Sequence, residues 1–168
     1  MADMKKLKPF ILKWEGGFSN HPLDKGGATN KGVTIGTFRQ FFGKDATVEQ
    51  LKNMTDSQWD TIFKAGYWDK FKADEIISQA VANICVDWAW ASGAVTAIKR
   101  VQRILCVKDD GIVGEKTLAA INAIAPKNLF DTIKFFRLQF VESIIKHNPS
   151  QKVFRNGWRN RINSIPYD

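Results

Sequence analysis

The segment from residue 16 to residue 34 lacks apolar periodicity and contains five glycines and one proline. Most of the remaining sequence has apolar residues at helical spacing. A loop of this length inside a compact domain is usually functional or folded on itself. The apolar groups at Phe18 and at residues 33–35 allow a short hairpin there. We therefore expect an all-α, mainly helical chain with a glycine-rich loop or short hairpin after its first helix.

Helices are expected on both sides of this segment. The first ends before Gly16 and has apolar residues one turn apart, namely Leu7, Phe10, Ile11 and Trp14. Capping-box patterns at residues 47–50 and 55–58 mark the beginnings of two more helices. A long buried helix is expected over residues 77–92, and helical patterns follow around residues 95–105, 118–121, 133–145 and 154–162. Because no repeat or obvious linker interrupts the pattern, residues 1–168 are expected to form a single domain.

Composition excludes two classes of protein. The 168 residues are 44% hydrophobic, which is too apolar for a disordered chain. No stretch approaches the roughly 18–20 apolar residues of a membrane span. Residues 1–14 place lysines before an apolar run, but the run stops at Lys13 and no small-residue cleavage site follows. We expect a globular protein that is made in the cytoplasm without a Sec signal.

The cysteines and histidines do not indicate a metal site. Cys85 and Cys106 lie in apolar surroundings, which predicts two buried free thiols. His21 and His147 are far apart and lack cysteine or carboxylate neighbours at metal-ligand spacing. No metal and no cofactor are therefore expected.

The net charge of +8 indicates a polyanionic partner or simply a well-solvated surface. Basic residues cluster near both ends, at Lys5, Lys6, Lys8, Lys13, Lys152, Arg155, Arg159 and Arg161. The chain lacks a basic recognition helix and an aromatic RNA-binding motif, so specific nucleic-acid binding is not expected. Anionic polymers of a bacterial envelope remain as the polyanionic partner.

Glu15 has the strongest indication of chemistry. It ends the first helix, where the helix dipole is negative, so capping does not explain a carboxylate there. The dipole and desolvation beside Trp14 both favour the protonated carboxyl, which is the state that a general acid needs. The alternative is an ordinary solvated glutamate at a helix end.

The glycine-rich segment offers the other groups that glycoside hydrolysis requires. Asp24 can act as a second, ionised carboxylate, and Thr29 can hold a water molecule. Asn30 can orient either partner through hydrogen bonds, and glycines such as Gly27 let the backbone approach a sugar chain closely, so Asn30 and Gly27 are candidate substrate-binding residues. By spacing alone, Asp24 fits equally a turn aspartate that binds its own backbone.

One block of the sequence reads Glu15-Gly16-Gly17-Phe18, followed by Asn20-x-Pro22-x-Asp24-x-Gly26-Gly27-Ala28-Thr29-Asn30-x-Gly32-Val33-Thr34. Shorter blocks follow in order at residues 82–93, 98–102, 110–118 and 157–161. Together these blocks resemble the glycoside hydrolase family 108 lysozymes over nearly the whole chain. Members of that family are bacterial and phage N-acetylmuramidases, some of them known as secretion activators.

The resemblance implies a lysozyme-like fold that cleaves the β-1,4 bond between N-acetylmuramic acid and N-acetylglucosamine in peptidoglycan. Glu15 matches the catalytic glutamate of the family, the proton donor. Phage lysozymes more widely have Glu-x8-Asp-x5-Thr, whereas this chain has Glu15-x8-Asp24-x4-Thr29, one residue shorter. Residues 1–93 would form a catalytic lobe that carries this loop, and residues 94–168 a helical lobe.

Further substrate contacts are expected from tryptophans and from the block at residues 82–93. Sugars stack on aromatic faces, which makes Trp68 and Trp90 candidates. Trp88 and Trp90 lie about 200° apart on one helix, so one of the two is expected in the core. The block also contributes Asp87 and Ser92 as candidates, although family members often carry asparagine before the Ser-Gly pair, where this chain has Ala91.

The block at residues 110–118 also resembles a turn of peptidoglycan-binding modules. Gly111 and Gly114 are expected to supply unusual backbone angles there, with Thr117 in the following helix. Because the motif is short and the region lacks a separate core, a structural turn inside the catalytic domain is preferred over an independent wall-binding module.

The leading hypothesis is an inverting muramidase, in which Glu15 protonates the leaving oxygen while Asp24 positions or activates water. The alternative is a non-catalytic peptidoglycan-binding or secretion-assisting protein with the same fold. Either protein acts at the cell wall or in the periplasm, which it reaches through a phage-type holin, cell lysis or a dedicated export route.

Overall fold

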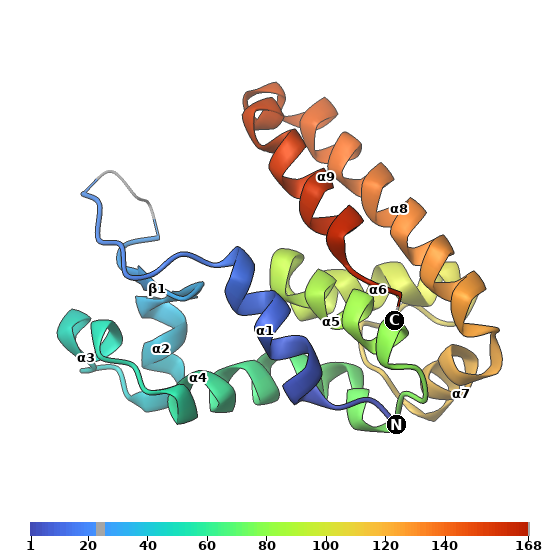
Figure 1. Ribbon diagram of the computed structural model, residues 1–168, viewed down its shortest axis with the longest axis horizontal. Coiled ribbons are helices and arrows are strands. Elements are labelled where there is room, and N and C mark those ends of the chain that lie inside the picture. Colours follow the sequence, from blue (N-terminus) through green and yellow to red (C-terminus); the bar gives the residue numbers. More distant parts are fainter. Residues whose placement is uncertain (23–25, 168) are drawn as a thin grey trace. The chain divides into compact units, whose positions relative to one another are not determined.

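The computed structural model of the protein describes residues 1–22 and 26–167. The described residues are mainly helical, as expected, with one two-stranded antiparallel hairpin (Figure 1). No helix among them is both long enough and apolar enough to cross a membrane. The elements in chain order are α1 (Met4–Trp14), β1 (Thr29–Asn30), β2 (Val33–Thr34), α2 (Ile35–Phe42), α3 (Val48–Lys52), α4 (Asp56–Phe63), the π-helix η1 (Lys64–Trp68), the 3-10 helices η2 (Asp69–Phe71) and η3 (Ala73–Glu75), α5 (Gln79–Ser92), α6 (Ala94–Ile104), α7 (Glu115–Ala123), α8 (Pro126–His147), the 3-10 helix η4 (Pro149–Phe154) and α9 (Arg155–Ser164).

The chain divides into two compact units. The N-terminal unit comprises Lys5–Gly66, and the C-terminal unit comprises Met1–Met4 together with Tyr67–Asp168. This boundary lies inside η1 and differs from the division at residue 93 that the sequence suggested. The assignment of residues 1–93 as a catalytic lobe and 94–168 as a helical lobe stays a prediction about function.

In the N-terminal unit, threonine side chains begin three helices. Thr34, Thr47 and Thr55 each accept a hydrogen bond from a backbone amide in the first turn of the helix that follows. Both predicted capping boxes are confirmed, because Gln50 and Gln58 return the bond to the backbone amides of Thr47 and Thr55. The buried apolar side chains of α1 and of these three helices include Leu7, Ile11, Phe38, Leu51, Trp59 and Ile62.

The short hairpin is confirmed, although its partners differ from those expected. Thr29 pairs with Thr34 and Asn30 with Val33, while Ser19 rather than Phe18 bridges to Thr29. Lys31 and Gly32 form the turn and both have positive φ, at 49° and 81°. Two central residues with positive φ are what the common two-residue hairpin turn requires.

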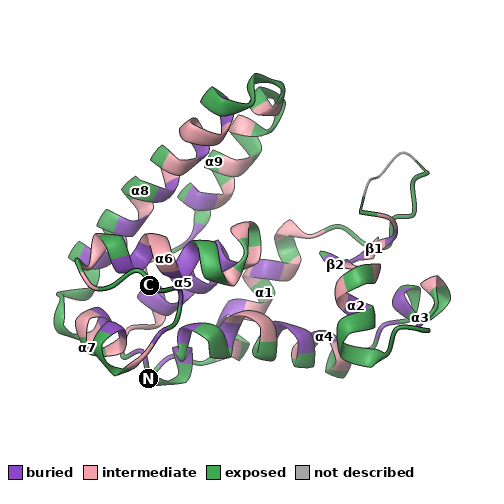
Figure 2. Ribbon diagram, turned by 180° about the vertical axis from the view of Figure 1, so that it is seen from behind, coloured by how far each residue is buried: buried purple, intermediate pink, exposed green. Residues whose placement is uncertain are grey.

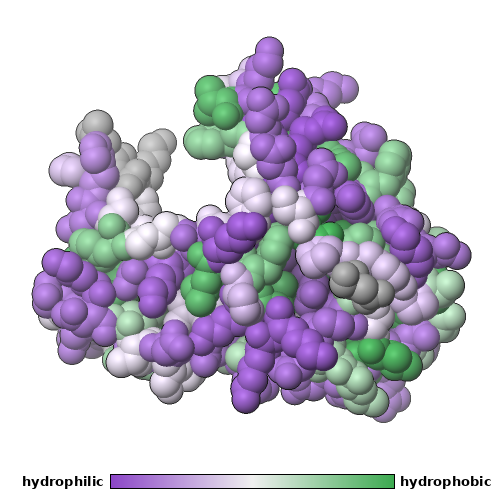
Figure 3. Space-filling model, in the orientation of Figure 1, coloured by the Kyte–Doolittle hydropathy of each residue, from purple (hydrophilic) through white to green (hydrophobic). Residues whose placement is uncertain are grey.

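The C-terminal unit is built around α5. Every residue of this helix from Ala80 to Ala89 is buried, as is typical of a helix enclosed by others (Figure 2). Helices α6 and α8 pack against α5, and α9 packs against α8. The 3-10 helix η4 connects α8 to α9, and hydrophobic side chains lie among hydrophilic ones at this end of the helical pair (Figure 3). The exposed hydrophobic residues of η4 are Val153 and Phe154.

The turn before α7 is organised by one buried side chain. Gln102, only 1% exposed, accepts a hydrogen bond from the Gly111 amide and places its own amide within 3.1 Å of Asp110, Ile112 and Thr117. Gly111 has the predicted left-handed backbone, with φ of 80°. The expectation for Gly114 is wrong: its φ is −96°, and it begins α7 in an extended conformation.

The two cysteines are in unlike environments, which corrects the expectation of two buried thiols. Cys85 is fully buried in α5, whereas Cys106 is exposed just after α6, with φ of 57°. Both cysteines have apolar neighbours in the sequence, which is why both were expected to be buried. However, the chain turns at Cys106, and this turn exposes its side chain to solvent.

This difference predicts the thiol chemistry of the folded protein. Burial raises the pKa of the Cys85 thiol to about 12, so neither access nor ionisation favours its reaction. Ellman's reagent is expected to titrate one thiol in the native protein and a second thiol only after unfolding. Cys106→Ser should remove the fast reaction. Two fast thiols in the native protein would contradict this prediction.

Candidate active site

Glu15 directly follows the last residue of α1. Its backbone amide donates to the Leu12 carbonyl at 3.3 Å, and its side chain is half-buried. Trp14 lies just before it and packs against Phe10, with ring centroids 6.3 Å apart. Within the described residues, the buried indole N–H of Trp14 has no acceptor. Glu15 therefore lies at the carbonyl end of α1 and follows, in the sequence, a tryptophan whose buried N–H has no acceptor among the described residues.

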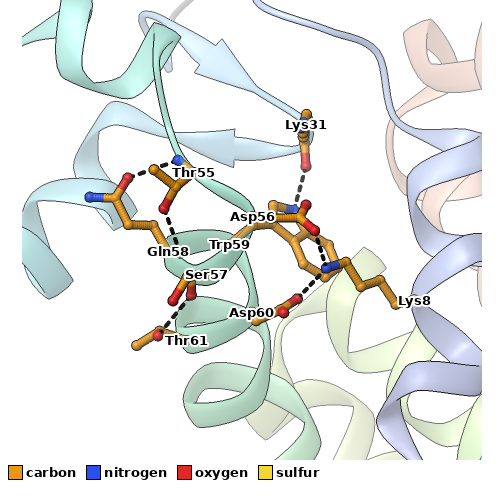
Figure 4. Close-up of polar contacts among 9 residues, drawn as sticks. All are labelled: Lys8, Lys31, Thr55, Asp56, Ser57, Gln58, Trp59, Asp60 and Thr61. Carbon is orange, nitrogen blue, oxygen red and sulfur yellow. Dashed lines mark hydrogen bonds and ion pairs between the residues drawn. The ribbon is translucent and has the colours of Figure 1, made fainter.

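The hairpin is fixed from two sides. The side-chain amide of Asn30, 5% exposed, donates to the carbonyls of Leu51 and Lys52 at 2.9 and 3.2 Å. These carbonyls belong to the last turn of α3, where helix carbonyls lack i+4 amide partners; that of Leu51 also accepts from the Met54 amide at 3.1 Å. Trp59 of α4 donates its indole N–H to the carbonyl of Lys31 in the hairpin turn, at 3.1 Å (Figure 4).

Helix α4 also holds α1. Lys8 extends from α1 to Asp60 at 2.6 Å and Asp56 at 3.1 Å, and its ammonium group lies 5.6 Å from the centre of the Trp59 ring (Figure 4). Asp56 and Asp60 are one turn apart, so both face the same side of α4. One helix therefore binds both the helix that Glu15 directly follows and the hairpin that carries Thr29.

Replacing Lys8 with methionine is expected to destabilise the N-terminal unit. Methionine retains most of the apolar stem but leaves Asp56 and Asp60 facing each other without a cation. The Lys8 side chain is 17% exposed, but those of Asp56 and Asp60 are 75% and 41% exposed, so solvent screens both ion pairs in part. We expect the free energy of unfolding to fall by about 1 kcal/mol in urea denaturation.

The matched control is Lys6→Met, on the same helix with an exposed side chain. This variant should unfold within error of the wild type. Equal stability of the Lys6 and Lys8 variants would show that the ion pairs do not hold α1.

Besides Asn30, three of the predicted site residues belong to the glycine-rich segment. Thr29 is half-buried in β1, and its backbone exchanges two hydrogen bonds with Ser19, each of 2.8 Å. Gly27 has φ of 72°, a conformation that glycine adopts without strain. The backbone conformation therefore accounts for a glycine at this position. Asp24 lies outside the described residues.

Two predicted substrate contacts prove to be interior residues. Trp68 is 0% exposed, and its indole N–H donates to Asp74 at 2.7 Å, so its ring is part of the core. Asp87 is also 0% exposed and has both carboxylate oxygens bound by arginines. The structure therefore gives Trp68 and Asp87 supporting roles in place of contact with a sugar chain.

The remaining candidates lie near the end of α5. Trp90 is half-buried and packs edge-on against Tyr67, with ring centroids 4.8 Å apart. Trp88 is only 1% exposed, which confirms that one of these two tryptophans is in the core. Ser92 is half-buried at the last residue of α5, before Gly93 with φ of 89°. Substrate contact by Trp90 and Ser92 stays a prediction.

Sequence reasoning missed the cluster that surrounds Asp87. Arg137 of α8 donates to Asp87 Oδ2 at 3.0 Å and to the Ile84 carbonyl at 3.2 Å. Arg161 of α9 contacts Asp87 Oδ1 at 2.8 Å. An aspartate within an otherwise apolar helix was the available signal, because a buried charge requires a partner. Its partners could not be named from spacing.

Comparisons with known proteins cover nearly the whole chain. Residues 8–93 match the family described as "Glycosyl hydrolase 108", and residues 96–163 match the family described as "Predicted Peptidoglycan domain". The second match includes the turn around Gly111, which the sequence placed by preference inside the catalytic domain. No curated protein is significantly similar to the chain.

Among solved structures, the chain is similar to SagA of Brucella abortus. The two are 30% identical, with a TM-score of 0.83, and the alignment covers 96% of this chain and 90% of that chain. Among residues 1–22 and 26–167, no group of three or more His, Cys, Asp or Glu side chains is placed to hold a metal ion.

Proposed function

Because this chain belongs to the glycosyl hydrolase 108 family and carries a predicted peptidoglycan domain, we propose that it is a lysozyme that hydrolyses the β-1,4 bond between N-acetylmuramic acid and N-acetylglucosamine. The observation that carries this proposal is the position of Glu15. It directly follows α1, inside the region matched by the hydrolase family, and α4 binds both α1 and the hairpin that follows.

In the proposed reaction, Glu15 is the general acid that protonates the oxygen of the leaving sugar. Asp24 positions or activates the attacking water and stabilises positive charge on the sugar ring. Thr29, in the hairpin, helps to hold that water. Inversion at the anomeric carbon is proposed by analogy with phage lysozymes, and proton NMR of the first-formed anomer distinguishes it from retention.

The proposed site of action is the bacterial cell wall or periplasm, with peptidoglycan as the main partner. The net charge of +8 favours association with anionic polymers of the envelope, and added salt should weaken that association. Release by a holin, by lysis or by another export route would bring the protein to this substrate.

A second candidate is a non-catalytic protein that binds peptidoglycan and assists secretion. The predicted peptidoglycan domain at residues 96–163 supports it, because wall binding does not require hydrolysis. This candidate predicts that the protein sediments with purified sacculi without releasing soluble fragments.

The decisive test is mass spectrometry of muropeptides released from purified sacculi, after borohydride reduction marks the new reducing ends. Reduced muramic acid ends, absent with heat-denatured protein, are the expected result. Reduced glucosamine ends would retain a hydrolase but overturn the proposed bond. Sedimentation with sacculi and no released fragments would instead favour the second candidate.

A further inference from the structure

A cavity of about 340 Å³ lies between α6 and α8 in the C-terminal unit. Phe136, Phe140 and Ser143 recur at i, i+4 and i+7, so they line one side of α8. Trp88 of α5 also lines the cavity, together with residues of α6 that lie on the same side of that helix: Arg100, Arg103 and Ile104. The cavity is at the lower end of the roughly 300–1,000 Å³ typical of ligand pockets.

Arg100 supplies an uncompensated charge to this apolar cavity. Its guanidinium group lies 4.5 Å from the centre of the Phe140 ring. Its side chain is half-buried, and no carboxylate pairs with it anywhere in the described part of the chain. Arg103 differs, because Asp109 binds it at 2.8 Å and neutralises it. The wall of the cavity therefore carries one net positive charge, held in place by stacking on an aromatic ring.

The same aromatic pair borders a second, smaller cavity of about 110 Å³. Trp88 and Phe140 line both cavities, and their rings pack edge-on with centroids 5.8 Å apart. Arg137 and Arg161 also line the second cavity, and both bind Asp87. The aromatic pair therefore borders both the cavity that contains Arg100 and the cavity lined by the arginines that bind Asp87.

A guanidinium held over an aromatic ring suits a planar carboxylate, which it can bind through two parallel hydrogen bonds. Within peptidoglycan, the carboxylates belong to the peptide stems, because the lactyl carboxyl of muramic acid is consumed in the amide bond to the stem. The glycan strand itself is uncharged. The apolar walls would meanwhile contact the alanine methyl groups that stems contain.

Resting on the proposed action on peptidoglycan, we propose that the cavity between α6 and α8 binds a carboxylate of the peptide stem, with Arg100 as the residue that binds it. The predicted peptidoglycan domain would then recognise the stems, while the N-terminal unit acts on the glycan. Dense peptide substitution would favour binding, whereas bare glycan would not.

The test is isothermal titration calorimetry of the full chain with the soluble pentapeptide L-Ala-γ-D-Glu-L-Lys-D-Ala-D-Ala. We expect Arg100→Gln to weaken binding about tenfold or more, since glutamine retains hydrogen bonding but not the charge. Arg159→Gln is the matched control, because Arg159 is an exposed arginine of the same unit that lines neither cavity. It should leave the affinity within twofold of the wild type.

A second measurement changes the ligand and tests it against the wild-type chain and against Arg100→Gln. Amidation of the pentapeptide carboxylates should weaken binding as much as Arg100→Gln does, and combining the two changes should add little. Unchanged affinity after either change would overturn the proposal, as would equal binding of an N-acetylglucosamine tetramer.

Muropeptide release from sacculi, measured on the same preparations, separates the two proposals. Release without pentapeptide binding would overturn the stem site and leave the hydrolase standing. Pentapeptide binding without muropeptide release would overturn the hydrolase and leave the stem site standing.

Discussion

Glu15→Gln is expected to lower the rate of muropeptide release from sacculi by at least about 100-fold, the usual lower range for a positioned general acid. Glutamine has the same shape but cannot donate a proton to the leaving sugar. The folded structure should tolerate the change, because Glu15 follows the last residue of α1 and is only half-buried.

The rate is best followed by chromatography of reduced muropeptides, with circular dichroism to verify folding. Asp45→Asn is a suitable control, since it removes an exposed carboxylate from the same unit. A folded Glu15→Gln protein that retains the wild-type rate would exclude Glu15 as the acid. Loss of activity in both variants would point to net charge rather than to proton donation.

Asp87→Asn is expected to destabilise the C-terminal unit by about 3–5 kcal/mol, because it removes the shared partner of two arginines. The side chain of Arg137 is 3% exposed and that of Arg161 is 14% exposed, so water cannot replace the lost carboxylate easily. Burial lowers the pKa of Arg137, and the charge of Asp87 opposes that effect. Without Asp87, the charged guanidinium remains in an apolar interior with the Ile84 carbonyl as its other bonded acceptor.

Urea denaturation of the full chain, followed by tryptophan fluorescence, measures this loss. Asp131→Asn provides the comparison, because Asp131 pairs with Lys127 on the exposed side of α8, where a single ion pair contributes about 0.5 kcal/mol or less. Similar midpoints for the two variants would mean that the buried cluster stabilises the fold no more than a surface pair does.

Local sequence patterns predicted the elements of the fold well. Apolar spacing placed the helices, and the Thr-x-x-Gln patterns placed the starts of α3 and α4, because both signals act within one or two turns. The hairpin could be predicted because its signal is also local: a segment that contains several glycines and lacks helical periodicity. Glu15 was recognisable from its position after an apolar helix and from its resemblance to a family pattern.

Contacts between segments far apart in the chain could not be predicted from the sequence. The two arginines that bind Asp87 lie 50 and 74 residues along the chain, and nothing in their neighbourhood marks them as its partners. Asn30 was read as a substrate ligand because a polar side chain beside a catalytic segment suits that role. The structure instead buries it against the carbonyls of α3. Trp68 was misread for a similar reason, since an aromatic residue looks alike in sequence whether it meets a sugar or the core.

The Asp87 cluster also bears on how the C-terminal unit unfolds. Arg137 belongs to α8 and Arg161 to α9, so one carboxylate on α5 ties both helices to the centre of the unit. Detaching either helix breaks one of the two ion pairs of a fully buried carboxylate. Partial opening of this helical pair is therefore disfavoured, and we expect α5, α8 and α9 to unfold together. A chain cut short before α9 would lose more than its last helix.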